Sequence, residues 1–117
     1  MSKDDFIRLR HMLDSAREAV QLIGGKSRSD LDRDRVLSLA LVRLLEVVGE
    51  AANRVTSATR QQNSEIPWSP IVSLRNRLIH GYDTINLDIL WKILTNDLPQ
   101  LIAQLEKIEY SRGEKKK

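Results

Sequence analysis

The chain has 117 residues, of which 41% are hydrophobic and 30% are charged. This length and composition predict one globular domain with a core of its own and exclude a disordered chain. The sequence contains no cysteine, which excludes disulfides, thiolate zinc sites and cysteine nucleophiles. The formal charge of +3 permits binding to a polyanion without requiring it.

Residues 1–110 are expected to form this domain, and residues 111–117, SRGEKKK, are expected to be a basic, flexible C-terminal tail. The first residues carry charges too early and too often for a signal peptide. No window approaches the roughly 18 consecutive apolar residues that a membrane span needs. We therefore expect a cytoplasmic protein without a membrane partner.

Apolar residues recur at helical spacing and predict an all-α fold, an antiparallel bundle of four to five helices. The first helix has its apolar stripe over residues 6–23 and should end at the glycine pair 24–25. Ser29 or Asp30 is the predicted cap of a second helix that runs to about Ala58.

This second helix has an apolar surface wider than one antiparallel neighbour covers. Its apolar residues are Leu37, Leu41, Leu44, Val48, Ala51 and Val55, widened by Val36, Ala40 and Val47 and, further round, by Leu39 and Leu45. The width predicts a second packing partner, for which another chain is a candidate.

The next segment, residues 60–70, is polar and contains two prolines, so it is predicted to be a loop. At its end, Ser69 is the predicted cap of a third helix and Pro70 its first residue. This helix should end close to His80, because Gly81 follows.

A fourth helix is expected to begin after a cap at Asn86. Pro99 has no amide donor and should kink or split this helix, with Asp97 as the candidate for a new cap. The apolar stripe then continues to Ile108. The sequence shows neither repeats nor strand-like alternation.

The segment RNRLIHGYD, residues 75–83, gathers the side chains with the most chemistry to offer. Asn76 and His80 are four residues apart and would share one face of the third helix. Arg75 and His80 lie about 140° apart round an ideal helix. They would meet only if the helix loosened near Gly81 or if a second chain supplied the missing partner.

These residue types suit a phosphodiester of RNA. A histidine can accept a proton from a ribose 2′-hydroxyl near neutral pH. An arginine can hold the non-bridging phosphate oxygens, and an asparagine can orient the histidine or donate to the same oxygens. Such a reaction needs neither metal nor cofactor, and the two histidines, His11 and His80, do not have the spacing of a metal site.

A structural role is the more common one for such residues. An arginine and a histidine at a helix C-terminus cap its carbonyls and interact with its dipole. Tyr82 would then be a half-buried aromatic residue. Arg77, His11 and Glu50 resemble surface or ion-pairing residues, and Trp68 and Trp91 resemble packing residues. The residues by themselves leave the function undecided.

The segment RNRLIHGY resembles the R-x4-H-x-Y signature of the HepT family in the HEPN superfamily, with Arg75, His80 and Tyr82 at its fixed positions. The blocks VVGEAANRV, EIPWSPIVSLRNRLIHGY and LDILWKILTNDLPQL are similar to the second, third and fourth helices of that family. The resemblance extends over residues 4–108. One departure is Leu31, at a position where an aromatic residue is expected.

The resemblance implies a dimeric bundle in which the signature segments of both subunits line one cleft. It implies a metal-independent endoribonuclease toxin that acts on RNA and not on DNA. His80 would be the general base, Arg75 the ligand of the phosphate and Asn76 the polar assistant. It also implies an antitoxin partner, a minimal nucleotidyltransferase of the MNT type, which would transfer AMP to Tyr82.

Two other functions stay open at this point. The chain could be a non-catalytic helical module that binds nucleotide or RNA and docks the nucleotidyltransferase. It could also be the protective component of the pair, with the nucleotidyltransferase as the toxic one. A site that binds phosphate and a site that cleaves it need the same residue types.

Overall fold

The fold is an all-α bundle whose helices are interrupted in several places, as the computed structural model of residues 1–80 and 84–115 shows. Its overall dimensions are 48 × 30 × 20 Å. In chain order the elements are α1 (Lys3–Leu22), α2 (Arg28–Arg33), α3 (Arg35–Asn53), α4 (Ser57–Gln62), α5 (Trp68–Val72), α6 (Leu74–Leu78), β1 (Ile79–His80), β2 (Thr84–Ile85), α7 (Leu87–Lys92), the π-helical segment η1 (Ile93–Asp97) and α8 (Leu98–Lys115).

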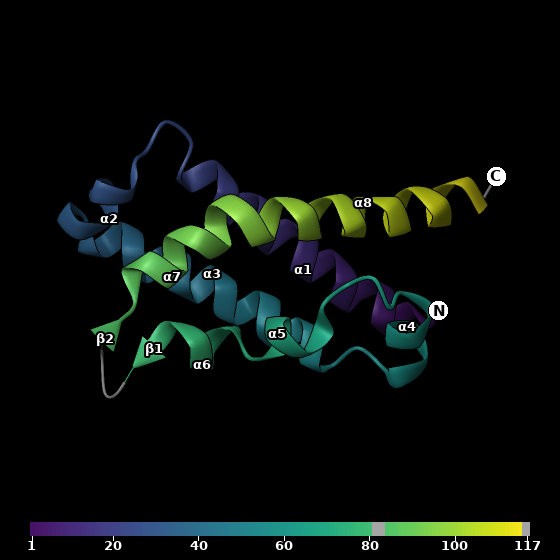
Figure 1. Cartoon of the computed structure of the whole chain (residues 1–117). Coiled ribbons are helices and arrows are strands. Elements are labelled where there is room, and N and C mark those ends of the chain that lie inside the picture. The colour runs from purple at the N-terminus through teal and green to yellow at the C-terminus, as the bar shows by residue number, and fades with distance from the viewer. Residues whose placement is uncertain (81–83, 116–117) are drawn as a thin grey trace.

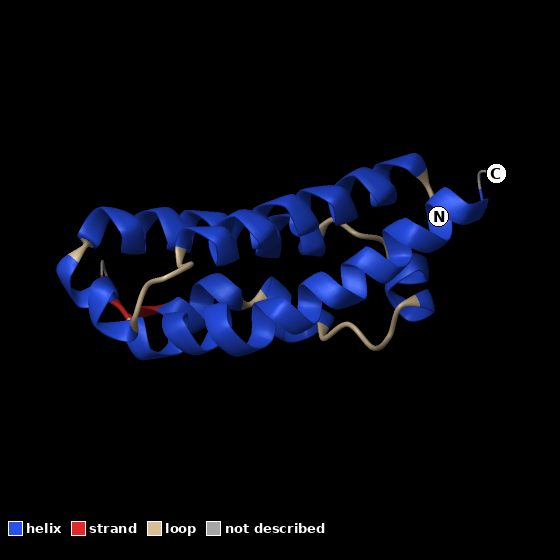
Figure 2. Ribbon diagram, turned by 90° about the horizontal axis from the view of Figure 1, so that it is seen from above, coloured by secondary structure: helices blue, strands red, loops and turns tan. Residues whose placement is uncertain are grey.

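Helix α1 packs against both α3 and α8 (Figure 1). The short helices α5 and α6 also pack against α3, and α6 contacts α7. Seen from above, the two short strands lie at one end of the bundle and both chain termini at the other (Figure 2). Among the residues that the structure describes, no helix is long and apolar enough to cross a membrane.

The predicted first helix is confirmed. The side chain of Ser2 accepts a 3.0 Å hydrogen bond from the amide of Asp5 and begins α1. Helix α1 ends at Leu22, just before the predicted glycine pair, and Gly25 has a φ of +74° in the turn that follows.

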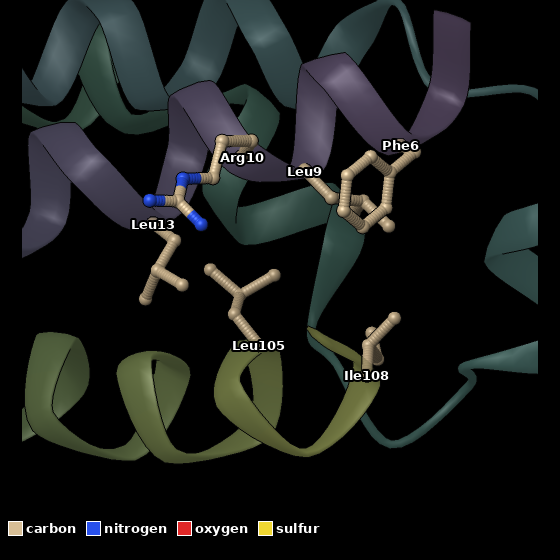
Figure 3. Close-up of a pocket in the computed structure, with 6 residues that line it drawn as sticks. All are labelled: Phe6, Leu9, Arg10, Leu13, Leu105 and Ile108. Carbon is tan, nitrogen blue, oxygen red and sulfur yellow. The ribbon is translucent and has the colours of Figure 1, made fainter. Parts of the chain in front are cut away.

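The stripe of α1 packs against α3 on one side and α8 on the other, as the side chains of Figure 3 show for the contact with α8. The cavity between these side chains measures about 10 Å³, so it holds one water molecule at most and is not a candidate binding site. Its lining residues are Phe6, Leu9, Arg10, Leu13, Leu105 and Ile108.

The prediction of one long second helix is wrong, because the chain is divided into α2, α3 and α4. Helix α2 begins two or three residues earlier than predicted, after Ser27, whose amide donates a 2.7 Å hydrogen bond to the carboxylate of Asp30. Asp34 then caps α3 by accepting a 3.0 Å bond from the amide of Leu37. At the other end, the predicted loop 60–70 overlaps α4, which continues to Gln62.

The wide apolar surface of α3 was predicted to need a second packing partner. Helices α5 and α6 of the same chain pack against it and cover most of this surface. Gly49 permits this contact: a Cβ atom there would lie 3.0 Å from the backbone oxygen of Ile71. The first turn of α3 is not covered in this way. Val36 is 77% exposed and Leu39 is 46% exposed.

The predicted third helix is also divided. Helix α5 begins at Trp68 with Pro67 at its N-cap, so the prediction of Ser69 as cap is wrong. Ser73 separates α5 from α6, which ends at Leu78. His80 therefore lies outside the helix, in β1, and β1 and β2 pair antiparallel. This small sheet was not predicted, because two-residue strands are too short to show alternation.

The fourth helix begins as predicted, because the side chain of Asn86 accepts a 3.0 Å bond from the amide of Ile89. Before Pro99 the helix widens into η1, in which the amide of Leu98 bonds the carbonyl of Ile93, five residues back. Helix α8 follows directly at Leu98. The prediction of Asp97 as a new cap is wrong, because Asp97 is the last residue of η1 and the helix continues through it. The expected bounds of the domain and of its tail stay predictions, and α8 continues to Lys115.

Candidate functional site

Helix α6 presents two of the candidate site residues to solvent. Leu74 and Leu78 are four residues apart and almost completely buried, and they fix the inner face of this short helix. Arg75 and Asn76 follow Leu74 directly and are both exposed. The local sequence therefore turns the arginine and the asparagine outward together.

Arg75 and Asn76 belong to one open surface pocket of about 220 Å³ between α3 and the α5–α6 segment. The pocket is lined by Glu46, Gly49, Glu50, Asn53, Val72, Arg75 and Asn76. Helix α3 contributes more than half of this lining. The close contact at Gly49 brings the two sides together, because a larger residue there would hold α5 further away.

Arg75 has an acidic neighbour in this pocket. Its Nε atom lies 3.6 Å from Oε2 of Glu46, and its side chain is 70% exposed while that of Glu46 is only 21% exposed. Sequence reasoning missed Glu46. The available signal was a carboxylate placed between two pairs of apolar residues, Leu44-Leu45 and Val47-Val48.

The other charged residues near the signature segment form separate ion pairs. Glu50 lies at the rim of the pocket, 61% exposed, and its carboxylate is 3.4 Å from Nη1 of Arg43. Arg77 pairs with Asp97 of η1 at 3.5 Å. The expectation that Glu50 and Arg77 are surface or ion-pairing residues is confirmed. Of the two arginines in α6, only Arg75 lines the pocket.

His80 is exposed on β1, directly opposite Thr84 of β2. It does not line the pocket of Arg75. The prediction that Asn76 and His80 share a helix face is wrong, because the helix ends before the histidine is reached. Tyr82, the predicted site of AMP transfer, lies outside the described residues.

A second pocket, of about 400 Å³, adjoins β2 on the side of α2 and α3. It is lined by Leu31, Asp32, Arg35, Ser38, Thr84, Ile85 and Leu87. Arg28 of α2 forms an ion pair of 2.8 Å with Asp88 of α7 and another of 3.1 Å with Asp32 of its own helix. The first pair links α2 to α7 at this end of the bundle. These two carboxylates raise the pKa of Arg28 above its ordinary value, Asp88 more than Asp32.

Within residues 1–80 and 84–115, no three histidine or acidic side chains gather as ligands for a metal ion. The groups that the site offers are a guanidinium, a carboxamide and an imidazole. A guanidinium binds phosphate oxygens through parallel hydrogen bonds, and an imidazole exchanges protons near neutral pH. Fold and site together define a small helical protein that exposes an arginine, an asparagine and a histidine, side-chain types capable of binding phosphate and transferring protons.

Comparison with known proteins agrees with that class. The family profile described as ribonuclease HepT-like matches residues 12–108, and the chain belongs to this family. A "Putative RNase" of Caldanaerobacter subterraneus is 34% identical over 100 residues, which cover 86% of this chain and 89% of the relative. A "Probable ribonuclease HepT" of Thermococcus cleftensis is 32% identical over 100 residues, covering 82% and 91%.

A further "Putative RNase", from Methanocaldococcus jannaschii, is 32% identical over 98 residues, which cover 84% of this chain and 90% of the relative. No solved structure gives a significant match. The chain is therefore a member of a ribonuclease family of the HEPN type that it matches over most of its length.

Proposed function

We propose that this chain is a metal-independent endoribonuclease and the toxin of a HepT/MNT toxin–antitoxin pair. Its membership of a ribonuclease family supports the proposal. The structural observation that carries it is the exposure of Arg75, whose side chain is 70% exposed in a pocket together with Asn76, while that of the neighbouring Arg77 is 36% exposed and pairs with Asp97. The more exposed of the two guanidinium groups is the one that matches the signature.

In the proposed reaction, a ribose 2′-hydroxyl attacks the adjacent phosphorus and His80 takes its proton. The bond from phosphorus to the 5′-oxygen breaks, that oxygen takes a proton from solvent water, and His80 returns its proton to the solvent. Arg75 stabilises the charge on the non-bridging oxygens, and Asn76 donates to the same oxygens. The products are a 2′,3′-cyclic phosphate and a 5′-hydroxyl. DNA has no 2′-hydroxyl and is therefore not a substrate.

The proposed active form is a homodimer. The exposed side of α3 begins with Val36 and Leu39 and continues through Arg43 and Val47 to Glu50, at helical spacing. Glu50 lies at the rim of the pocket that contains Arg75. A second copy that covered the apolar start of this side would therefore bring its own signature segment towards the same region.

The proposed partner is an MNT-type nucleotidyltransferase that acts as antitoxin. The phenol oxygen of Tyr82 would attack the α-phosphorus of ATP and release pyrophosphate, and the resulting AMP would carry negative charge beside His80. That charge would repel the RNA phosphate. This part of the proposal is based on the family signature, which places the tyrosine two residues after the histidine.

The test is cleavage of a labelled hairpin RNA by the purified chain in EDTA, with the product ends identified. We expect a 2′,3′-cyclic phosphate that is lost in both His80→Ala and Arg75→Ala. Arg77→Ala is the matched control, because it removes the same charge two residues away. Cleavage that survives in the two site variants would overturn the proposal. A folded, unmodified protein that binds the RNA without cleaving it would instead identify the non-catalytic binding module.

A further inference from the structure

We infer that Glu46 is the positioning residue of Arg75, holding the guanidinium by its Nε edge so that the opposite edge faces the RNA phosphate. This inference rests on the proposed function, and it assigns a role to a residue outside the R-x4-H-x-Y signature. It starts from the 3.6 Å separation of Glu46 Oε2 and Arg75 Nε.

The two partners differ in how firmly they are held. Glu46 lies in the middle of α3, and its neighbours Leu45 and Val48 are completely buried. Arg75 belongs to a short helix, and its side chain is 70% exposed. A long exposed side chain has many rotamers, so a fixed carboxylate beside it selects among them. The rigid helix therefore orients the arginine rather than the reverse.

The atoms involved decide which edge remains free. A guanidinium has five N–H donors in a planar fork, one on Nε and two on each terminal nitrogen. The ion pair with Glu46 is on the Nε side. Both terminal nitrogens of Arg75 therefore remain available for two parallel hydrogen bonds to non-bridging phosphate oxygens. A lysine at position 75 would have a single point charge and could not be oriented in this way.

The carboxylate has a second, opposing effect. It places a negative charge in the pocket that receives the phosphate, so it weakens RNA binding while it orients the arginine. A residue that only stabilised the fold would not combine these effects. Replacement of Glu46 by glutamine should therefore separate the two kinetic constants, lowering kcat while KM stays the same or falls.

The experiment compares Glu46→Gln with Glu18→Gln on the hairpin RNA. Glu18→Gln is the control, since it removes an exposed carboxylate from α1, away from the pocket of Arg75. We expect kcat to fall roughly 10- to 100-fold in Glu46→Gln, the range that misplacement of a reacting group produces. Glu18→Gln should keep the wild-type kcat.

Combination with Arg75→Ala tests whether Glu46 acts through the arginine. In that background Glu46→Gln should cause no further loss of kcat/KM. A further loss by the same factor, or a wild-type kcat in Glu46→Gln alone, would overturn the inference. Wild-type activity in Arg75→Ala would instead remove the proposed function on which the inference rests.

Two further measurements keep the test decisive. If Glu46→Gln does not fold, Glu46→Asp retains the charge but withdraws it by one methylene, and it should have an intermediate kcat. RNA binding is measured by fluorescence anisotropy in a His80→Ala background, where no cleavage interferes. There Arg75→Ala should weaken binding and Glu46→Gln should not. Equal weakening by both would overturn the inference.

Discussion

The carboxylate of Asp5 accepts a 2.6 Å hydrogen bond from the hydroxyl of Thr59, which lies 54 residues later in the chain. The hydroxyl of Thr56 donates a second bond of 2.5 Å to the same oxygen, and the Thr56 amide donates a third, of 3.1 Å, to the other oxygen. Asp5 is only 2% exposed. One buried carboxylate thus joins the start of α1 to the start of α4.

This arrangement predicts a dependence of stability on pH. Burial raises the pKa of Asp5, but the bonds from Thr56 and Thr59 together outweigh it, and the pKa lies below its ordinary value of 3.8. The unfolded chain therefore binds more protons at acid pH. The stabilisation is complete above the unfolded pKa and is lost as the pH falls through the folded pKa. Urea denaturation from pH 7 down to about pH 2 should show the free energy of unfolding decreasing below about pH 4.

Asp5→Asn should lower the free energy of unfolding at pH 7 by about 1–3 kcal/mol, the usual effect of losing hydrogen bonds to a buried charged group. It should also flatten the acid branch of the stability curve, that is, the decrease in the free energy of unfolding below about pH 4 should become smaller. Asp4→Asn is the matched control, because Asp4 is the exposed neighbour. A variant Asp5→Asn with the same acid branch as the wild type would contradict this account.

Whether a helix end or a strand could be predicted from the sequence depends on how local the residues are that determine it. The cap at Asn86 was predictable because it depends on one side chain and the helix directly after it. The break at Asp34 was not predicted, although its cap is as local as that of Asn86, because the helical pattern continues through the break from α2 into α3. The strand at His80 depends on pairing with Thr84, a relationship that helix periodicity does not describe.

A second prediction concerns Gly49 in the middle of α3. Glycine to alanine in a helix normally stabilises by about 1 kcal/mol. Here the new Cβ would lie 3.0 Å from the backbone oxygen of Ile71, and a backbone atom cannot rotate away. We expect the clash to exceed the gain in propensity, for a net loss of about 1–2 kcal/mol in the free energy of unfolding. Gly49→Val should lose more than Gly49→Ala; an alanine variant more stable than the wild type would show that α5 moves freely.

A third prediction concerns Arg60, whose guanidinium closes the end of α3. Its Nη2 donates bonds of 2.9 and 3.1 Å to the carbonyls of Ala52 and Asn53, and its Nε donates a 3.1 Å bond to Val55. The same group lies 5.7 Å from the ring centre of Trp68. Arg60→Ala should cost about 2 kcal/mol, as these carbonyls lose a charged donor.

Arg60→Lys is the control for charge in thermal denaturation. A lysine keeps the positive charge near the helix C-terminus. It lacks the planar guanidinium with which the arginine reaches three carbonyls. We expect its stability to lie between those of the wild type and the alanine variant. A lysine variant as stable as the wild type would mean that charge alone is sufficient.

The candidate site was predictable only where it is contiguous in the sequence. Arg75, Asn76 and His80 stand within six residues and are recognisable by type and spacing. Glu46 contributes through a contact with Arg75, 29 residues later in the chain, and its spacing on α3 gives no indication of what it faces. The side of α6 on which Arg75 lies was accessible from the sequence, because the apolar pair Leu74 and Leu78 marks the inner face of this helix.

The last prediction concerns the exposed start of α3. Val36 and Leu39 are large apolar residues, 77% and 46% exposed, on the side of the helix that continues to the pocket. If a second copy covers them, the double variant Val36→Asp, Leu39→Asp buries two charges in the interface and should shift the protein from dimer to monomer in light scattering. Leu22→Asp is the matched control, since Leu22 is 37% exposed on α1.

RNA cleavage should fall with the loss of the dimer, because the proposed cleft contains the signature segments of both copies. The proportion of dimer rises with protein concentration, so the double variant should regain activity when it is concentrated. That recovery separates loss of the interface from damage to the site itself. A monomeric variant with wild-type activity at every concentration would show that one copy of Arg75 and His80 is sufficient.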